Sequence, residues 1–161
     1  MRRDPHRRSL PRLAALALLT AAVGCSAAPA PRRAAAPPMP QTLAAEAVAT
    51  QEFGLLAGGG WAAAWNLWPT TAQQAFSQAE FIRLNTECRP LLGLPYVIDQ
   101  TAKLDPDTVR VDWHRADTTG SNTVVHQDGR WHFTPDPATL TSYRLGVDQL
   151  ISQRRAAGSC H

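Results

Sequence analysis

The sequence lacks a hydrophobic run long enough to cross a membrane. The apolar stretch near its start, from Leu13 to Val23, is shorter than the roughly 20 residues that a spanning helix needs. A segment with five arginines precedes this stretch, and small residues follow it. A basic segment, a short apolar run and small residues are typical of a secretory signal. We therefore expect residues 1–24 to be removed on export and not to anchor the chain.

The sequence also lacks a surplus of basic residues once this signal is removed. Residues 1–24 contain five of the 16 Lys and Arg residues and one of the 13 Asp and Glu residues, so their removal changes the formal net charge from +3 to −1. Proteins that bind nucleic acid need a basic surface that neutralises phosphates. The mature chain has no such excess of charge, and we expect no nucleic-acid partner.

Cysteine is scarce, with three residues in the chain, and the first of them lies at the end of the signal. The segment "AVGC", from Ala22 to Cys25, resembles the bacterial lipobox. The resemblance implies that Cys25 receives a diacylglyceryl group, that the chain is cut before it, and that the lipid holds the protein on the outer face of the cell membrane. The alternative is an ordinary secretory signal in which Cys25 has no role.

Lipidation of Cys25 leaves Cys88 and Cys160 as an even pair in an oxidising compartment. We expect a disulfide between them, closing a loop of about 70 residues. The alternative, a metal site, needs clustered ligands at set spacing, and only His161 lies beside Cys160. We therefore predict no metal and no cofactor.

The mature chain divides into a tether and one domain. Residues 25–40 begin with the lipidated cysteine, and the rest of this segment contains five prolines without a hydrophobic period. Such a segment is stiff, and its 15 residues after Cys25 reach about 45 Å when extended. Residues 41–161 are long enough for one domain and contain all five tryptophans.

Helical patterns open this domain and close it. We expect a helix from an N-cap at Thr42 to Gly58, a short helix over residues 61–68, and a third over residues 77–88 that starts with a capping box of Ser77 and Glu80. A single last helix follows Asp136 as N-cap, with Pro137 at its first position.

Four strand patterns lie between these helices, at residues 96–104, 108–116, 122–127 and 130–134. In the first pair, we expect Leu104 to face Val109 and Gln100 to face Trp113 across the turn that contains Pro106. In the second pair, the dipeptide 128–129, Asp-Gly, predicts a two-residue hairpin that places His126 opposite Trp131. Helices followed by an antiparallel meander and a further helix indicate the α+β class.

The segment "EFGLLAGGGWAAAWNLWPTTAQQAFSQAEFIRL", followed by "GLPY" and by a meander ending in "DGRWHF", resembles small actinobacterial lipoproteins with a domain of the nuclear-transport-factor-2-like (SnoaL-like, cystatin-like) fold. A similar module precedes the transpeptidase domain of some penicillin-binding proteins. The resemblance implies a cone-shaped domain in which helices close the concave face of a curved antiparallel sheet over a pocket.

Aromatic side chains are the candidates for the lining of this pocket. Trp61, Trp65 and Trp68 recur at helical spacing, while the strand pattern places Trp113 and Trp131 on the inward face. Tyr96 and His126 are the inward titratable groups that the strand pattern provides. A stripe of large aromatic residues is also what an ordinary core needs, so a filled core is the alternative to a pocket for an apolar ligand.

Catalytic sets are absent from the predicted strands. Enzymes of the nuclear-transport-factor-2-like fold need an inward carboxylate or histidine as general base. The alternation of side chains along the strands places Asp99 and Asp112 on the outward face. His114 and His132 fall on the outer face and His126 on the inner one, so they do not form a common metal site. We therefore expect a non-catalytic domain that binds an apolar ligand or a protein partner such as cell-wall machinery. The alternative is a pocket enzyme of the SnoaL or ketosteroid-isomerase type.

Overall fold

The structure is a computed structural model that describes residues 41–161. The signal, the lipidated Cys25 and the tether are predictions for residues 1–40 and lie outside the described residues. The described part forms helices and strands in the order α1 (Gln41–Gly58), α2 (Trp61–Trp65), α3 (Thr70–Ala75), α4 (Gln78–Glu87), β1 (Val97–Asp105), β2 (Thr108–Arg115), β3 (Thr118–Gln127), β4 (Arg130–Thr134), α5 (Pro137–Tyr143) and α6 (Val147–Ala156).

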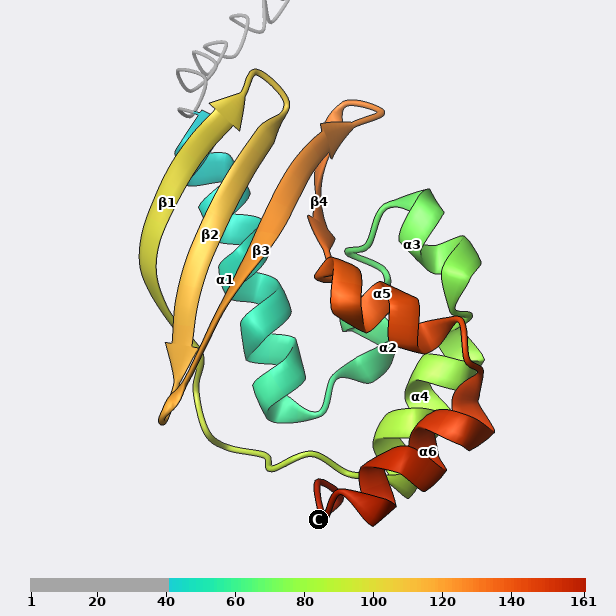
Figure 1. Cartoon of the computed structure of the whole chain (residues 1–161). Helices are drawn as coiled ribbons and strands as arrows, with labels where there is room; N and C mark the ends of the chain where they lie inside the picture. The colour runs from blue at the N-terminus through green and yellow to red at the C-terminus, as the bar shows by residue number, and fades with distance from the viewer. Residues whose placement is uncertain (1–40) are drawn as a thin grey trace, which may run out of the picture. The chain divides into compact units, whose positions relative to one another are not determined.

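The four strands form one antiparallel sheet in chain order, β1-β2-β3-β4. Helix α1 lies across one face of this sheet, and helices α2 to α6 gather beyond β4 (Figure 1). This arrangement confirms the predicted α+β class and the predicted four-stranded meander. No helix between residues 41 and 161 is both long and apolar enough to span a bilayer.

The second hairpin has the predicted register. His126 pairs with Trp131, and Val124 pairs with Phe133. Asp128 and Gly129 have φ angles of 51° and 75°, which are the left-handed values that a two-residue hairpin turn of this type requires.

The predicted register of the first hairpin is wrong. Trp113 pairs with Ile98 and not with Gln100, and Val109 pairs with Lys103 and not with Leu104. The register shifts between Ile98 and Gln100 and again between Lys103 and Asp105. An extra residue in one strand exchanges the faces of the residues beyond it. Lys103 therefore lies on the side of α1, where its Nζ donates to Gln41 Oε1 at 2.6 Å, while Leu104 is 54% exposed.

The helices differ from the prediction at four places. The first helix includes Gln41, so Thr42 lies inside it and is not its N-cap. The second helix, predicted over residues 61–68, ends at Trp65. An additional short helix, α3, follows Pro69. The predicted last helix is two helices, α5 and α6, because Gly146 has a φ of 85° and interrupts the helical backbone. The predicted caps are confirmed at Ser77, whose hydroxyl accepts from the Glu80 amide, and at Asp136, whose carboxylate accepts from the Thr139 amide.

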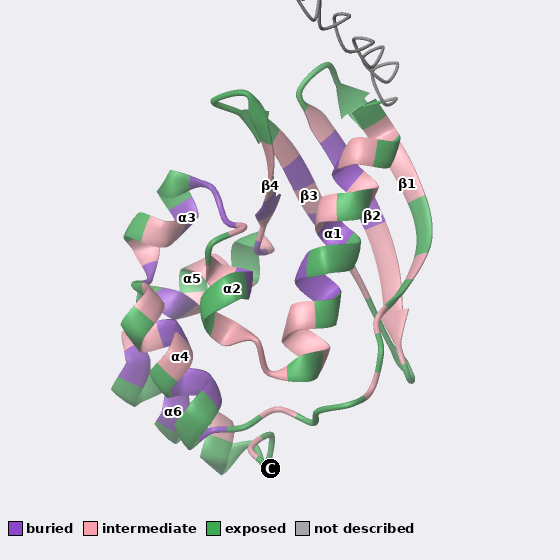
Figure 2. Ribbon diagram, turned by 180° about the vertical axis from the view of Figure 1, so that it is seen from behind, coloured by how far each residue is buried: buried purple, intermediate pink, exposed green. Residues whose placement is uncertain are grey.

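One hydrophobic core joins the sheet to the helices. Between α1 and the sheet it contains small residues of the helix, such as Ala45 and Ala49, and valines of the strands, such as Val111 and Val124. The buried residues lie along the contact of α1 with the sheet and among the helices beyond β4 (Figure 2). Residues 41–161 thus have a core of their own, so we expect this part of the chain to fold without the segment that precedes it.

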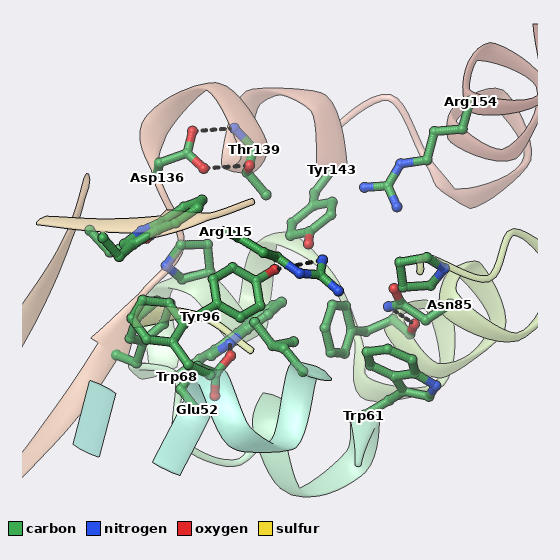
Figure 3. Close-up of a pocket in the computed structure, with 18 residues that line it drawn as sticks. Glu52, Trp61, Trp68, Asn85, Tyr96, Arg115, Asp136, Thr139, Tyr143 and Arg154 are labelled. Atoms are coloured by element: carbon green, nitrogen blue, oxygen red, sulfur yellow. Dashed lines mark hydrogen bonds between the residues drawn. The ribbon is translucent and has the colours of Figure 1, made fainter. Parts of the chain in front are cut away.

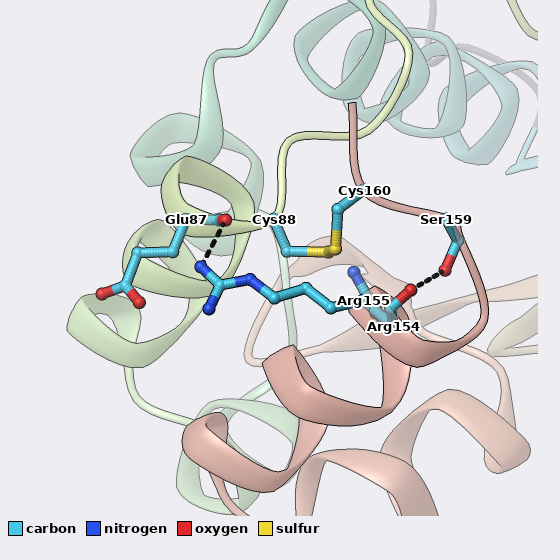
Figure 4. Close-up of a disulfide and its surroundings, with 6 residues drawn as sticks. All are labelled: Glu87, Cys88, Arg154, Arg155, Ser159 and Cys160. Carbon is cyan, nitrogen blue, oxygen red and sulfur yellow. Dashed lines mark hydrogen bonds between the residues drawn. A yellow bond between two sulfur atoms is a disulfide. The ribbon is translucent and has the colours of Figure 1, made fainter.

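A disulfide ties the end of the chain to α4. Cys88 and Cys160 lie at bonding distance, with their Cα atoms 4.6 Å apart, as the cysteine count predicts. The tail between α6 and Cys160 turns back on itself, because the amide and the hydroxyl of Ser159 both donate to the Arg154 carbonyl at 3.0 Å (Figure 4). The His161 amide also donates to the Arg89 carbonyl at 2.7 Å, so both ends of the bridge are held.

Candidate functional site

A cavity of about 280 Å³ lies between α1, the sheet and the helices beyond β4 (Figure 3). This volume is close to the lower end of the range for small-molecule sites, roughly 300–1,000 Å³. Aromatic side chains from the helices and strands dominate its lining, and a few polar groups lie among them. The polar and charged side chains that line it are Glu52, Asn85, Arg115, Asn122, Asp136, Thr139 and Arg154, together with the hydroxyls of Tyr96 and Tyr143.

Helix α1 carries a carboxyl group into this cavity. Its buried residues are Ala45, Ala49, Glu52 and Phe53, which recur at intervals of three and four and so form one stripe. The two alanines leave room for the helix to lie close to the sheet. Glu52 belongs to the same stripe, so its side chain points inward with only 1% of the residue exposed.

The buried Glu52 carboxyl has one hydrogen-bond partner. Its Oε1 accepts from Trp68 Nε1 at 3.0 Å, whereas Oε2 has no partner among the described residues. Burial raises the pKa of Glu52 to about 8, and the hydrogen bond from Trp68 lowers it by less than burial raises it. At neutral pH the carboxyl is therefore protonated, and a proton on Oε2 is compatible with the hydrogen bond that Oε1 accepts from the indole. Glu52 thus presents an unused O–H donor.

The cavity wall next to Glu52 consists of aromatic rings in mutual contact. The ring of Trp68 lies 4.6 Å from that of Phe81 and 5.8 Å from that of Tyr143, measured between centroids. Trp68, Phe81 and Tyr143 are all buried, so this end of the cavity is apolar. Burial raises the pKa of the Tyr143 phenol, whereas nearby Arg154 acts to lower it, and the hydroxyl remains a neutral hydrogen-bonding group.

The sheet contributes an indole that depends on a glycine opposite it. Trp113 on β2 pairs directly with Gly120 on β3, and a Cβ at position 120 would lie 2.3 Å from Cζ2 of this indole. Trp113 Nε1 donates to Asn122 Oδ1 at 2.7 Å, and Asn122 Nδ2 donates to the Thr134 carbonyl at 3.1 Å. The indole is therefore held against the strand on the side that lines the cavity.

Arg115, at the end of β2, fixes the loop that precedes β1. Its guanidinium donates to the carbonyls of Leu91 and Leu94 and, at 3.3 Å, to the Tyr96 hydroxyl. It also lies over the Tyr96 ring, 4.7 Å from the centroid, in a cation–π contact. These contacts hold a positive charge and a phenol at the side of the cavity that is partly exposed.

The predicted site residues fall into two groups in the structure. Trp61, Trp68, Tyr96 and Trp113 line the cavity. The other three residues, Trp65, His126 and Trp131, lie elsewhere.

These three residues lie in two places outside the cavity. Trp65 Nε1 donates to the Phe76 carbonyl at 2.8 Å. Helix α2 ends at Trp65, so Trp68 does not follow on the same helical face. His126 and Trp131 contact each other near the tip of the second hairpin, with ring centroids 5.2 Å apart.

Two of the three histidines of the sheet lie beside carboxylates. His114 Nδ1 is 2.7 Å from Asp99 Oδ1, and His126 Nδ1 is 3.5 Å from Asp107 Oδ1. Within residues 41–161, no three His, Cys, Asp or Glu side chains come together in a way that suits a metal ion.

The sequence patterns place none of the four charged residues of the cavity there, namely Glu52, Arg115, Asp136 and Arg154, and identify Asp136 only as a helix cap. The strand pattern contains no inward-facing carboxylate, and the inward carboxyl lies on α1. A signal for Glu52 exists in the sequence, because it falls seven residues after Ala45 and three after Ala49 on the apolar stripe. A signal exists for the arginines as well, because Arg115 continues the alternation of Val111 and Trp113 on β2, and Arg154 follows Leu150 and Ile151 at helical spacing on α6.

No protein-family model matches the chain, and no curated protein matches it either.

Proposed function

We propose that this protein is a lipid-anchored lipoprotein of the cell envelope whose domain binds an apolar ligand in the cavity beside Glu52. The observation that carries the proposal is the unpartnered Oε2 of a carboxyl that is only 1% exposed, in a wall of aromatic rings. A buried polar atom without a partner costs roughly 1–3 kcal/mol, and a ligand atom that accepts a hydrogen bond relieves this cost.

The cavity favours a ligand with an apolar body and an oxygen acceptor. The rings of Trp68, Phe81 and Tyr143 offer apolar contact, and the Glu52 O–H offers a single directional hydrogen bond. A carbonyl, ether or hydroxyl oxygen fits this donor, whereas a hydrocarbon leaves it unsatisfied. The position of this cavity between helices and one face of an antiparallel sheet supports a fold of the nuclear-transport-factor-2-like type.

The ligand-binding proposal is tested by native mass spectrometry of the soluble chain, residues 26–161, isolated from cells that export it. We expect a bound small molecule that is released on denaturation. The variant Glu52→Leu should lose it, because leucine has no hydrogen-bond donor, with affinity falling about tenfold or more. The matched variant Glu52→Gln keeps an amide donor of similar size and should retain the ligand.

An empty wild-type protein would contradict this proposal. Equal retention by the leucine and glutamine variants would contradict the role given to Glu52.

The anchoring part of the proposal rests on the segment that ends in Cys25. The variant Cys25→Ala removes the sulfur that takes up the diacylglyceryl group, so we expect the protein to remain uncleaved or to leave the membrane fraction. Fractionation of cells followed by mass spectrometry of the N-terminus measures both outcomes. Cleaved protein that stays in the membrane fraction without Cys25 would refute lipid anchoring.

A pocket enzyme is the second candidate, and the pKa of Glu52 favours it. A carboxyl whose pKa is about 8 exchanges a proton near neutral pH, which is what general acid–base catalysis requires. Glu52→Gln distinguishes the two functions, because glutamine keeps the hydrogen bond to Trp68 and cannot transfer a proton. Binding that survives this substitution while turnover disappears supports the enzyme.

A further inference from the structure

Two arginines give the partly exposed side of the cavity a positive charge. Arg115 and Arg154 both line the cavity and are both partly exposed, and their guanidinium groups point toward it from different elements (Figure 3). The cavity has two carboxyl groups, Glu52 and Asp136. Glu52 is protonated at neutral pH, so Asp136 carries the negative charge that remains.

The Asp136 carboxylate is already engaged. Its Oδ1 accepts from the Thr139 amide at 3.0 Å, and its Oδ2 accepts from the Thr139 hydroxyl at 2.5 Å, which caps α5. The lining of the cavity therefore has a net positive charge. Its one ionised carboxylate, Asp136, is bound to the first turn of α5.

Arg154 is the arginine whose charge is available to a ligand. No carboxylate of residues 41–161 lies within ion-pairing distance of its guanidinium, in contrast to Arg83, which pairs with Glu87 and Asp148 at 2.7 Å. Its guanidinium hydrogen-bonds to the hydroxyl of the buried Tyr143, which is a neutral group and leaves the charge of Arg154 uncompensated. Arg115, by contrast, has donors committed to two carbonyls and to Tyr96.

The backbone that carries Arg154 is held in place. The Arg154 carbonyl accepts from both the amide and the hydroxyl of Ser159, and Cys160 joins the next turn to α4 (Figure 4). Because this backbone is already ordered, Arg154 loses little conformational entropy when it binds an anion, and this favours affinity.

From these observations we infer that the cavity binds an anionic amphiphile, a carboxylate with an apolar chain, whose carboxylate pairs with Arg154 and whose chain lies on the aromatic wall toward Glu52. This inference rests on the proposed ligand-binding function and adds the charge of the ligand to it. Arginine pairs with a carboxylate through two parallel hydrogen bonds, which favours this head group over a neutral one.

The test compares two probes that differ only in the head group, together with acetate, which has the carboxylate but not the chain. The binding of 10-hydroxydecanoate, 1,10-decanediol and acetate to residues 26–161 is measured at pH 7 by tryptophan fluorescence, since Trp61, Trp68 and Trp113 line the cavity. The acid and the diol have the same chain and the same terminal hydroxyl for Glu52. We expect the acid to bind about tenfold more tightly than the diol, and acetate to bind far more weakly than both.

Variants assign this preference to Arg154. Arg154→Gln should reduce the preference for the acid to about twofold or less, and Arg154→Lys, which keeps the charge but not the two parallel hydrogen bonds, should give an intermediate preference. The matched control Arg155→Gln changes the adjacent arginine, which donates to the Glu87 carbonyl at 3.2 Å and does not line the cavity, and it should leave the preference unchanged.

Each contrary outcome has one meaning. Equal affinity for the acid and the diol overturns the inference and leaves the proposed function standing, whereas no binding of either probe overturns the proposed function as well. Acetate binding as tight as that of the acid overturns the role of the chain. An unchanged preference in Arg154→Gln overturns the role of Arg154.

Discussion

Replacing Cys88 and Cys160 together by alanine is expected to lower Tm by about 15 °C. The bridge spans 72 residues, and the chain-entropy relation gives about 4 kcal/mol of stabilisation for a loop of this length. For a domain of this size, 1 kcal/mol corresponds to a Tm shift of about 4 °C. Thermal unfolding of residues 26–161, followed by circular dichroism, measures the change.

Reductant provides the matched control for this prediction. It should lower Tm of the wild-type protein to the value of the double variant and leave the variant unchanged. Two free thiols in protein isolated from the cell surface, or a wild-type Tm that reductant does not change, would contradict the bridge.

The free energy of unfolding should fall as pH rises, and Glu52 is the expected cause. The pKa of its carboxyl is about 8 in the folded chain, whereas the ordinary value of 4.5 applies in the unfolded chain. Between these two pH values the folded chain holds a proton that the unfolded chain has lost, so folding is favoured most at low pH and the advantage disappears as pH approaches 8. The shift corresponds to roughly 5 kcal/mol over this window.

The variant Glu52→Gln should not show this loss. Measured by urea unfolding between pH 5 and pH 8.5, the free energy of unfolding of the wild-type protein should fall steeply relative to that of the glutamine variant. Glu46→Gln, on the same helix and outside this cavity, is the control and should follow the wild-type curve. Parallel curves for wild type and Glu52→Gln would show that Glu52 does not titrate differently in the two states.

The sequence predicts those parts of the fold that depend on local chemistry. The hairpin at Asp128 and Gly129 follows from residues that tolerate left-handed backbone angles, and the caps at Ser77 and Asp136 follow from side chains that accept from nearby amides. These features need no knowledge of distant residues.

The first hairpin and the cavity depend on contacts that local patterns do not contain. Strand alternation assigns Leu104 to the inward face, but the register shift between Ile98 and Gln100 exchanges the faces beyond it and places Lys103 there instead. Arg115 and Arg154 come together at one cavity although 38 intervening residues separate them in the chain. The packing of β2 against α1 and of α6 against α4 brings both arginines to the same cavity.

The close approach of Trp113 to Gly120 has a consequence for how related sequences vary. A Cβ at position 120 would lie 2.3 Å from the indole, so the large ring is compatible only with glycine opposite it. Through evolution these two positions should therefore change as a pair. A relative that carries an ordinary side chain at position 120 should have a smaller residue at position 113, and hence a cavity of different width and a different choice of ligand.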